Sequence, residues 1–307
     1  KEFVLTYIIL LLTLVVANYD ESLAKDLVYV SGLAYCPAAR ILTSKCGKAT
    51  TETEAMGMQV LHAFDNGLDQ NGITYTILKN EEKKILYVAF SGTKDPEQLI
   101  TEVVEAFPVK YAIHPEVEGA LAFDYFYAYY VNGFREDFNE KIKDTLQTYS
   151  DYSVIFTGHS LGGAMTVHAC ADFMLNGMGD NRKVSVYTYG QPRVGNPALI
   201  DSFVKDLEGF FRVDHHRDIV PHIPPCITNL HEGCLHDGLL PFYPYHSAQE
   251  IWYNSDFTSF TSCSTSNGED PACSDKEIND SIPDHLTYFG VHVGGVHSQL
   301  SSIMKSV

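Results

Sequence analysis

The stretch that decides the fold is Gly158-His159-Ser160-Leu161-Gly162, with Gly163 directly after it. Its pattern is G-x-S-x-G, and it stands between an apolar strand-like run at residues 153–157 and an apolar helix-like run at residues 161–175. Small residues on both sides of the serine allow a sharp bend from strand to helix, which lifts the hydroxyl above the edge of a sheet. We therefore predict that Ser160 is a nucleophile held in a strained strand-to-helix turn.

Strand-like and helix-like runs alternate on both sides of this turn. Short apolar or β-branched runs predict strands, and longer runs with apolar residues at helical spacing predict helices. The expected strands cover residues 73–78, 84–90, 153–157, 184–189, 210–215 and 250–253, and the expected helices cover residues 22–34, 161–175 and 197–207. Residues 116–149 are expected to be mostly helical, with Gly119 and Gly133 as the only strong breakers. This alternation predicts an α/β fold with a central, mostly parallel sheet and helices on both faces. No internal repeat or long linker divides the chain, so residues 18–307 are expected to form a single catalytic domain.

The charge balance excludes one class of partner. The 307 residues include 21 Lys and Arg against 39 Asp and Glu, which gives a formal net charge of -18. No run rich in Lys or Arg is present that could follow a phosphate backbone. We therefore expect no nucleic-acid partner.

The first seventeen residues are typical of a secretory signal peptide. Lys1 precedes an apolar stretch, and Ala17 offers a small residue for cleavage before Asn18. The apolar stretch is too short for a comfortable membrane span. We therefore expect residues 1–17 to be removed and the mature protein to be secreted.

Cysteine usage fits an oxidising compartment, because six of the seven cysteines fall into three local pairs. The expected disulfides are Cys36–Cys46, Cys226–Cys234 and Cys263–Cys273, a pairing that rests on proximity along the chain. Cys170 is left over within an apolar run and is expected to be a buried free thiol that packs as a small hydrophobic residue. Asn279-Asp280-Ser281 is a candidate glycosylation sequon.

A serine nucleophile needs a general base that a carboxylate orients, and after this kind of turn the order along the chain is Ser, acid, His. Asp218 is the preferred acid because it follows the expected strand at residues 210–215, where a loop at the carboxyl edge of the sheet would hold it. Asp214 and Asp237 are its rivals. Asp214 falls inside the strand pattern, which favours a structural role, and Asp237 lies in a loop-rich region.

Four of the thirteen histidines lie late enough in the chain and outside the Asp218 loop to be natural candidates for the base. They are His246, His285, His292 and His297. His285 is preferred because residues 282–290 place it at the start of a short aromatic helix after a proline-containing loop, at a flexible edge from which it can reach inward. The other three are expected to be structural or surface residues.

Five stretches together resemble the fungal-type class 3 triacylglycerol lipases. These stretches are residues 89–93, 157–164, 189–195, 217–225 and 284–290, in the family's order over roughly residues 60 to 295. The resemblance implies an α/β-hydrolase fold with a lid helix over the active site. The family's triad falls on Ser160, Asp218 and His285, the same residues that the chemistry favours.

The resemblance also implies an oxyanion hole and a lid. The oxyanion hole would consist of the backbone N–H of Leu161 with the backbone N–H and hydroxyl of Thr93, and Ser91 stands where the family usually has arginine. The lid would cover residues 94–108. One helical face of that segment is apolar and includes Leu99, Ile100, Val103, Val104 and Phe107. The tryptophan often found in family lids is absent there.

Together these observations predict a secreted, monomeric lipase that hydrolyses carboxylic ester bonds of acylglycerols at an oil–water or membrane interface. The reaction would pass through an acyl-enzyme and would need neither a metal nor an organic cofactor. A feruloyl-type esterase and a phospholipase share the same triad and remain alternatives. An inactive lipid-binding module is a further alternative from a different class of protein.

Overall fold

The computed structural model describes residues 18–66, 72–93, 110–111, 114, 116–226, 228–229, 233–234, 244–247 and 249–299. The expected signal peptide (1–17), the expected lid (94–108) and Asp237 lie outside these residues. Within the described part of the chain, no helix combines the length and the apolar character that a membrane span requires.

An eight-stranded sheet forms the centre of the molecule, in the order β1-β2-β3-β6-β7-β8-β11-β12. The strands are β1 (Met58–Asp65), β2 (Thr74–Asn80), β3 (Ile85–Phe90), β6 (Ser153–His159), β7 (Val184–Tyr189), β8 (Gly209–His215), β11 (Glu250–Tyr253) and β12 (Phe260–Ser262). Strands β3, β6, β7, β8 and β11 run parallel, whereas β1, β2 and β12 pair antiparallel with their neighbours. The predicted mostly parallel sheet is therefore confirmed.

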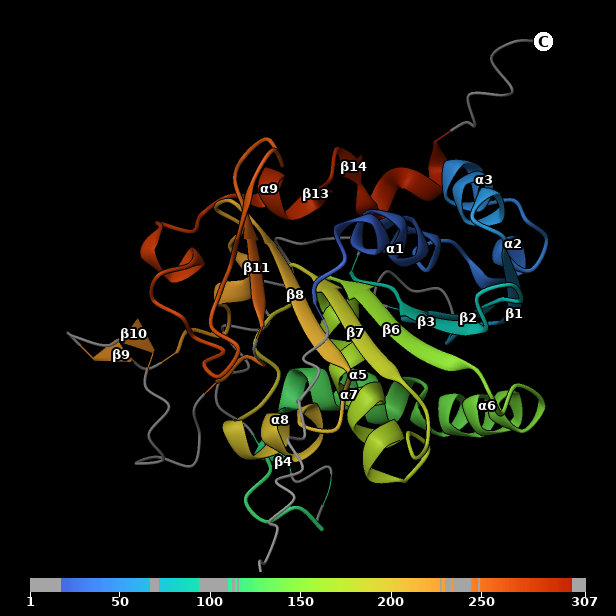
Figure 1. Ribbon diagram of the computed structural model, residues 1–307, viewed down its shortest axis with the longest axis horizontal. Coiled ribbons are helices and arrows are strands. Elements are labelled where there is room, and N and C mark those ends of the chain that lie inside the picture. The colour runs from blue at the N-terminus through green and yellow to red at the C-terminus, as the bar shows by residue number, and fades with distance from the viewer. Residues whose placement is uncertain are drawn as a thin grey trace, which may run out of the picture.

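Helices cover both faces of this sheet (Figure 1). The helices are α1 (Glu21–Leu33), α2 (Ala38–Ile41), α3 (Gly47–Ala55), α5 (Asp124–Gly133), α6 (Arg135–Thr148), α7 (Leu161–Leu175), α8 (Pro197–Val204) and α9 (Ile282–Leu286). One apolar core lies between the sheet and α5, α6 and α7, and a second lies between the sheet and α1. Because both faces are covered, β3 and β6 are buried at every residue after the first instead of alternating between buried and exposed residues.

Short elements form the loops at the edges of the sheet. They are β4 (Lys110–Tyr111), β5 (Ala122–Phe123), β9 (Thr228–Asn229), β10 (Gly233–Cys234), β13 (Thr287–Tyr288), β14 (Val291–His292), η1 (Val220–His222), η2 (Ser274–Lys276) and η3 (Val293–Ser298). The carboxyl ends of β3, β6, β7 and β8 meet at one edge, since Phe90 pairs with Gly158 and His159 pairs with Tyr189. Loops that leave these four strands are therefore brought close together.

Residues 116–149 are mostly helical, as expected, and the helix is interrupted directly after Gly133, one of the two expected breakers. Helix α5 ends at Gly133 and α6 begins at Arg135, while Phe134 between them has a φ of -158°. The Phe134 side chain is buried in the core, and Arg135 turns to form a two-pronged ion pair with Asp172 on α7, with N–O distances of 2.6 and 2.8 Å. Packing at the glycine therefore favours a bend over a continuous helix.

All three expected disulfides are present: Cys36–Cys46, Cys226–Cys234 and Cys263–Cys273. Cys170 is a free thiol inside α7, as predicted. It is fully buried, and this burial raises the pKa of the thiol. A thiol in that state is a poor nucleophile.

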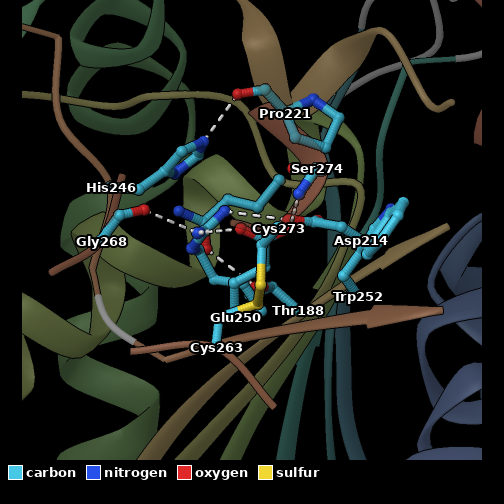
Figure 2. A network of polar contacts seen from close by, with 12 residues as sticks. Thr188, Asp214, Pro221, His246, Glu250, Trp252, Cys263, Gly268, Cys273 and Ser274 are labelled. Atoms are coloured by element: carbon cyan, nitrogen blue, oxygen red, sulfur yellow. Dashed lines mark hydrogen bonds and ion pairs between the residues drawn. A yellow bond between two sulfur atoms is a disulfide. The ribbon is translucent and has the colours of Figure 1, made fainter. Parts of the chain in front are cut away.

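A buried ionic cluster joins β8 to β11 (Figure 2). The Arg212 guanidinium donates to the carboxylate of Asp214 at 3.0 Å and lies 3.6 Å from that of Glu250. It also donates to the backbone oxygens of Ser247 and Gly268, at 2.8 and 2.9 Å. One cation therefore faces two carboxylates, and burial raises the pKa of both carboxyls to about 7. The pair consequently retains a shared proton near neutral pH.

We expect the loss of this proton to make the protein less stable as the pH rises. Ordinary carboxyls lose their protons near pH 4, whereas the folded pair has a pKa raised to about 7. The raised pKa of the folded pair therefore adds to the free energy of unfolding in full below about pH 4, and this contribution is lost as the pH rises through about 7. Replacement Asp214→Asn keeps the shape of the side chain without its charge, and should flatten the decline in the free energy of unfolding measured in urea between about pH 5 and 8. The exposed control Asp144→Asn should keep the wild-type slope, and an equal slope in Asp214→Asn would contradict the shared proton.

Candidate active site

The turn between β6 and α7 holds Ser160 in a strained conformation. Its φ is 62° and its ψ is -131°, a combination that residues with a side chain rarely adopt. A Cβ on Gly158 would lie 2.3 Å from the carbonyl oxygen of Gly162, and a Cβ on Gly162 would lie 2.2 Å from that of Phe90. Both positions therefore require glycine, and the predicted strained turn is confirmed.

Asp218 and His285 come from two separate loops and meet beside this turn. Asp218 follows the end of β8, and His285 lies in α9, whose first turn is capped by the side chain of Ser281. Nδ1 of His285 lies 3.0 Å from Oδ2 of Asp218, and both side chains are buried. A carboxylate oxygen can only accept, so Nδ1 carries the proton and Nε2 is left as the basic nitrogen.

The carboxylate of Asp218 accepts two further hydrogen bonds. The hydroxyl of Tyr288 donates to Oδ2 at 2.6 Å, and the backbone N–H of Val220 donates to Oδ1 at 2.8 Å. Burial by itself would raise the pKa of Asp218, but His285 and these donors together lower the pKa below its ordinary value. Asp218 therefore stays ionised and holds the His285 ring in one orientation.

Two buried polar atoms at the centre of the site have no hydrogen-bond partner among the described residues. They are Oγ of Ser160 and Nε2 of His285. The ring of His159, the residue before the serine, stacks on the ring of His285 with centroids 4.6 Å apart. Buried polar groups are normally paired, so a hydroxyl and a basic nitrogen left unpaired at one place indicate a chemical role.

Of the two residues expected to bind an oxyanion, Leu161 directly follows Ser160 and Thr93 directly follows Gly92, which packs against Ser160. Leu161 is the first residue of α7, where backbone N–H groups have no partner within the helix. Thr93 follows Gly92, and a Cβ on Gly92 would lie only 3.0 Å from Cβ of Ser160. The segment that ends at Thr93 therefore packs directly against the strained turn.

Ser91 extends the pairing of β2 and β3 by one residue. Its backbone N–H donates to the oxygen of Thr74 at 2.8 Å, and its hydroxyl accepts from the N–H of Thr74 at 2.9 Å. The side chain is buried. The backbone and the hydroxyl of Ser91 therefore both fix this part of the chain against β2.

The rival residues occupy other places. Asp214 is paired with Arg212 in the buried ionic cluster. His246 shares a 2.7 Å hydrogen bond between Nε2 and the oxygen of Pro221, and burial lowers the pKa of its ring well below the usual value. His292 is exposed on β14. None of these three is brought to the pair of Asp218 and His285 by the described contacts, as the sequence analysis expected.

Two residues at the site had no role in the sequence analysis. Gly190 follows β7 with a φ of +56°, and a Cβ there would lie 2.6 Å from Oδ2 of Asp218 and 2.7 Å from Nδ1 of His285. Tyr288 donates to the acid, as described above. The signal for Gly190 was a glycine directly after a parallel strand, at the edge where the site forms.

Two groups of side chains have donor atoms close enough together to suggest a metal site. They are Glu250 with Cys263 and Cys273, and Cys234 with Glu269 and Asp275. Every cysteine in these groups belongs to a disulfide. Since the thiolate is the form that ligates a metal, neither group fits a metal ion.

Comparison with known proteins identifies the relatives of this chain. The model of the family "Lipase (class 3)" matches residues 87–228. A lipase of Caenorhabditis elegans is 30% identical over 303 residues, which cover 90% of this chain and 81% of that protein. A lipase of Rhizopus niveus is 32% identical over 228 residues, which cover 74% of this chain and 52% of that protein, so the match spans about half of that relative.

A solved structure gives the same result for the fold. The crystal structure of a lipase from Rhizopus microsporus var. chinensis is similar with a TM-score of 0.73 and 30% sequence identity, over 91% of this chain and 91% of that chain. The predicted α/β-hydrolase fold is thereby confirmed. On this evidence the chain belongs to the class 3 lipases, a family of carboxylic ester hydrolases.

Proposed function

We propose that the protein is a secreted lipase that cleaves ester bonds of acylglycerols through an acyl-enzyme on Ser160. The observation that supports this most directly is the buried pair of His285 and Asp218, 3.0 Å apart, beside a serine at a positive φ. The hydroxyl of Ser160 and Nε2 of His285 are both buried and have no hydrogen-bond partner among the described residues. Acyl transfer needs just these groups.

In the first half of the reaction Nε2 of His285 takes the proton of Ser160 as Oγ attacks the ester carbonyl. The negative charge on the carbonyl oxygen is held by the backbone N–H of Leu161 and by Thr93. His285 then gives its proton to the leaving alcohol. Asp218 stays ionised and stabilises the positive imidazolium that forms in between.

In the second half water replaces the alcohol. His285 removes a proton from water, the hydroxide attacks the acyl carbon, and the same oxyanion contacts are used again. Collapse of the intermediate releases the fatty acid and returns the proton to Oγ of Ser160. Every group in both halves is supplied by the chain, so no added cofactor takes part in the proposal.

Two observations support secretion and a lipid substrate. Three disulfides fit an oxidising compartment, in agreement with the signal-like residues 1–17. The relatives at 30% identity or more are lipases, and the segment at residues 94–108 has the apolar helical face expected of a lid. The protein would act at an oil–water or membrane interface as a monomer.

The nucleophile and the substrate can be tested in one experiment. Hydrolysis of an emulsified long-chain triacylglycerol should rise sharply once the substrate exceeds its solubility limit, and Ser160→Ala should lower the rate by at least about 10⁴-fold. The control Ser202→Ala, which removes a hydroxyl bonded only within α8, should keep the wild-type rate. Activity on soluble short-chain esters alone would favour an esterase, and activity on neither would favour the inactive lipid-binding module.

The close approach of Gly190 to the triad can be tested by adding a single methyl group. An alanine there would place its Cβ within 3 Å of Asp218, His285 and Tyr288, so Gly190→Ala should lower kcat/KM by about 10²-fold or more. Gly290 is the matched control, because its φ is also positive at +73° but no atom lies within 4 Å of a Cβ there. Gly290→Ala should cost about 1 kcal/mol of stability and leave kcat/KM near the wild-type value. Equal activity in the two variants would show that the contacts of Gly190 with the triad are not important.

A further inference from the structure

Three separate segments must keep their relative positions for the proposed reaction. They are the segment ending at Thr93, the turn at Ser160 and the short helix that holds His285. The bond between Asp218 and His285 fixes the ring of the histidine but not the place of its main chain relative to the sheet. Nδ1 of His215, the last residue of β8, lies 2.9 Å from the backbone oxygen of Asp284 and ties α9 to one strand. A contact with His285 itself is still needed next to the nucleophile.

His159 makes that contact from inside the strained turn. Its Nε2 lies 2.7 Å from the backbone oxygen of His285, and its ring stacks on the His285 ring with an angle of 26° between the planes. The side chain is 1% exposed. The residue before the nucleophile is thereby bound to the main chain of the residue that acts as base.

The charge and tautomer of His159 follow from its surroundings. Burial, followed by the nearby His285, lowers the pKa of His159 to about 3, so the ring is neutral near neutral pH. A backbone carbonyl can only accept, so Nε2 of His159 carries its single proton. Nδ1 must then accept, and the hydroxyl of Tyr35 lies 2.7 Å from it.

Tyr35 connects this histidine to the oxyanion segment. A Cβ on Gly92, the residue before Thr93, would lie 2.1 Å from the Tyr35 hydroxyl, so the hydroxyl contacts the Gly92 backbone directly. Tyr35 is itself held firmly, because it is buried and is followed by Cys36 of the first disulfide. The outer end of the contact chain is therefore anchored in the core.

We propose that Tyr35 and neutral His159 are positioning residues that hold the main chain of His285 and the segment before Thr93 in register around Ser160. The inference rests on the proposed catalytic roles of those three residues. Neutral His159 suits this place because His285 becomes positive during the reaction, and a second cation stacked on it would be repelled. A displacement of about 1 Å at a reacting group is enough to lower a rate by about 10²-fold.

Replacement His159→Leu removes both hydrogen bonds, and His159→Gln restores one donor and one acceptor at a similar separation. We expect His159→Leu to lower kcat on a soluble ester by about 10- to 100-fold while KM changes by less than about twofold. His159→Gln should recover to within about threefold of wild type. Tyr35→Phe should lower kcat less than His159→Leu, and the double variant should be no slower than His159→Leu alone, since the two residues act as one unit.

An organophosphonate that reacts with the nucleophilic serine separates positioning from folding. If His159 positions the site, His159→Leu should still be labelled once per chain, but with a rate constant lowered by the same factor as kcat. If the residue only supports folding, a smaller fraction of chains would be labelled, and the chains that are labelled would react with the wild-type rate constant. The matched control is His168→Leu, because His168 is equally buried and neutral but lies within α7 away from the triad, and it should keep the wild-type labelling rate.

Four results would overturn the inference: a wild-type kcat in His159→Leu, a His159→Gln variant as slow as the leucine variant, a loss confined to the labelled fraction, or an equal loss in His168→Leu. Ser160→Ala tests the proposed function separately. Labelling that persists in Ser160→Ala would refute the proposed nucleophile. Labelling that vanishes there, together with full activity in His159→Leu, would refute only the positioning role.

Discussion

The active site depends on how closely the turn at Ser160 lies against strand β3. A Cβ on Gly162 would lie 2.2 Å from the carbonyl oxygen of Phe90, and a Cβ on Gly92 would lie 3.0 Å from Cβ of Ser160. This backbone contact brings the start of α7 and the segment before Thr93 together around one hydroxyl. Strain at Ser160 is tolerated because β6 is hydrogen-bonded to strands on both sides and buried on both faces.

The pKa values of the buried carboxyls near this site are shifted in opposite directions. Asp218 has a cationic or polar donor for each carboxylate oxygen, and the pKa of its carboxyl is held below the ordinary value. A few residues earlier, Asp214 shares one arginine with Glu250 of β11, and burial raises the pKa of both carboxyls. The same strand and its following loop thus hold one carboxylate that must stay ionised and another that contributes most when it is protonated. The difference comes from the number of donors available to each carboxylate.

The sequence alone was enough to predict the sheet, the strained turn, the three disulfides and the pairing of Asp218 with His285, because each depends on local patterns or on the order of residues along the chain. It also marked Gly133 as a breaker within the mostly helical residues 116–149, but it did not show that Arg135, just beyond the break, pairs with Asp172. Nor did it assign a role to His159 or Gly190. Their importance depends on which loops approach them, and those loops are more than 25 residues away in the chain.

Contacts between the loops of Asp218 and His285 also help to fix the distance between the acid and the base. The backbone N–H of Ser281 donates to the oxygen of Arg217 at 2.9 Å, next to Asp218, and the side chain of His216 pairs with Asp284, next to His285, at 3.0 Å. These contacts join the two loops into one unit, in addition to the bond between Asp218 and His285. Two further bonds tie this unit to the central strands. Nδ1 of His215, at the end of β8, lies 2.9 Å from the backbone oxygen of Asp284, and Nε2 of His159, at the end of β6, lies 2.7 Å from that of His285. The bond from His159 comes from the residue next to Ser160, so it restrains the base relative to the nucleophile most directly.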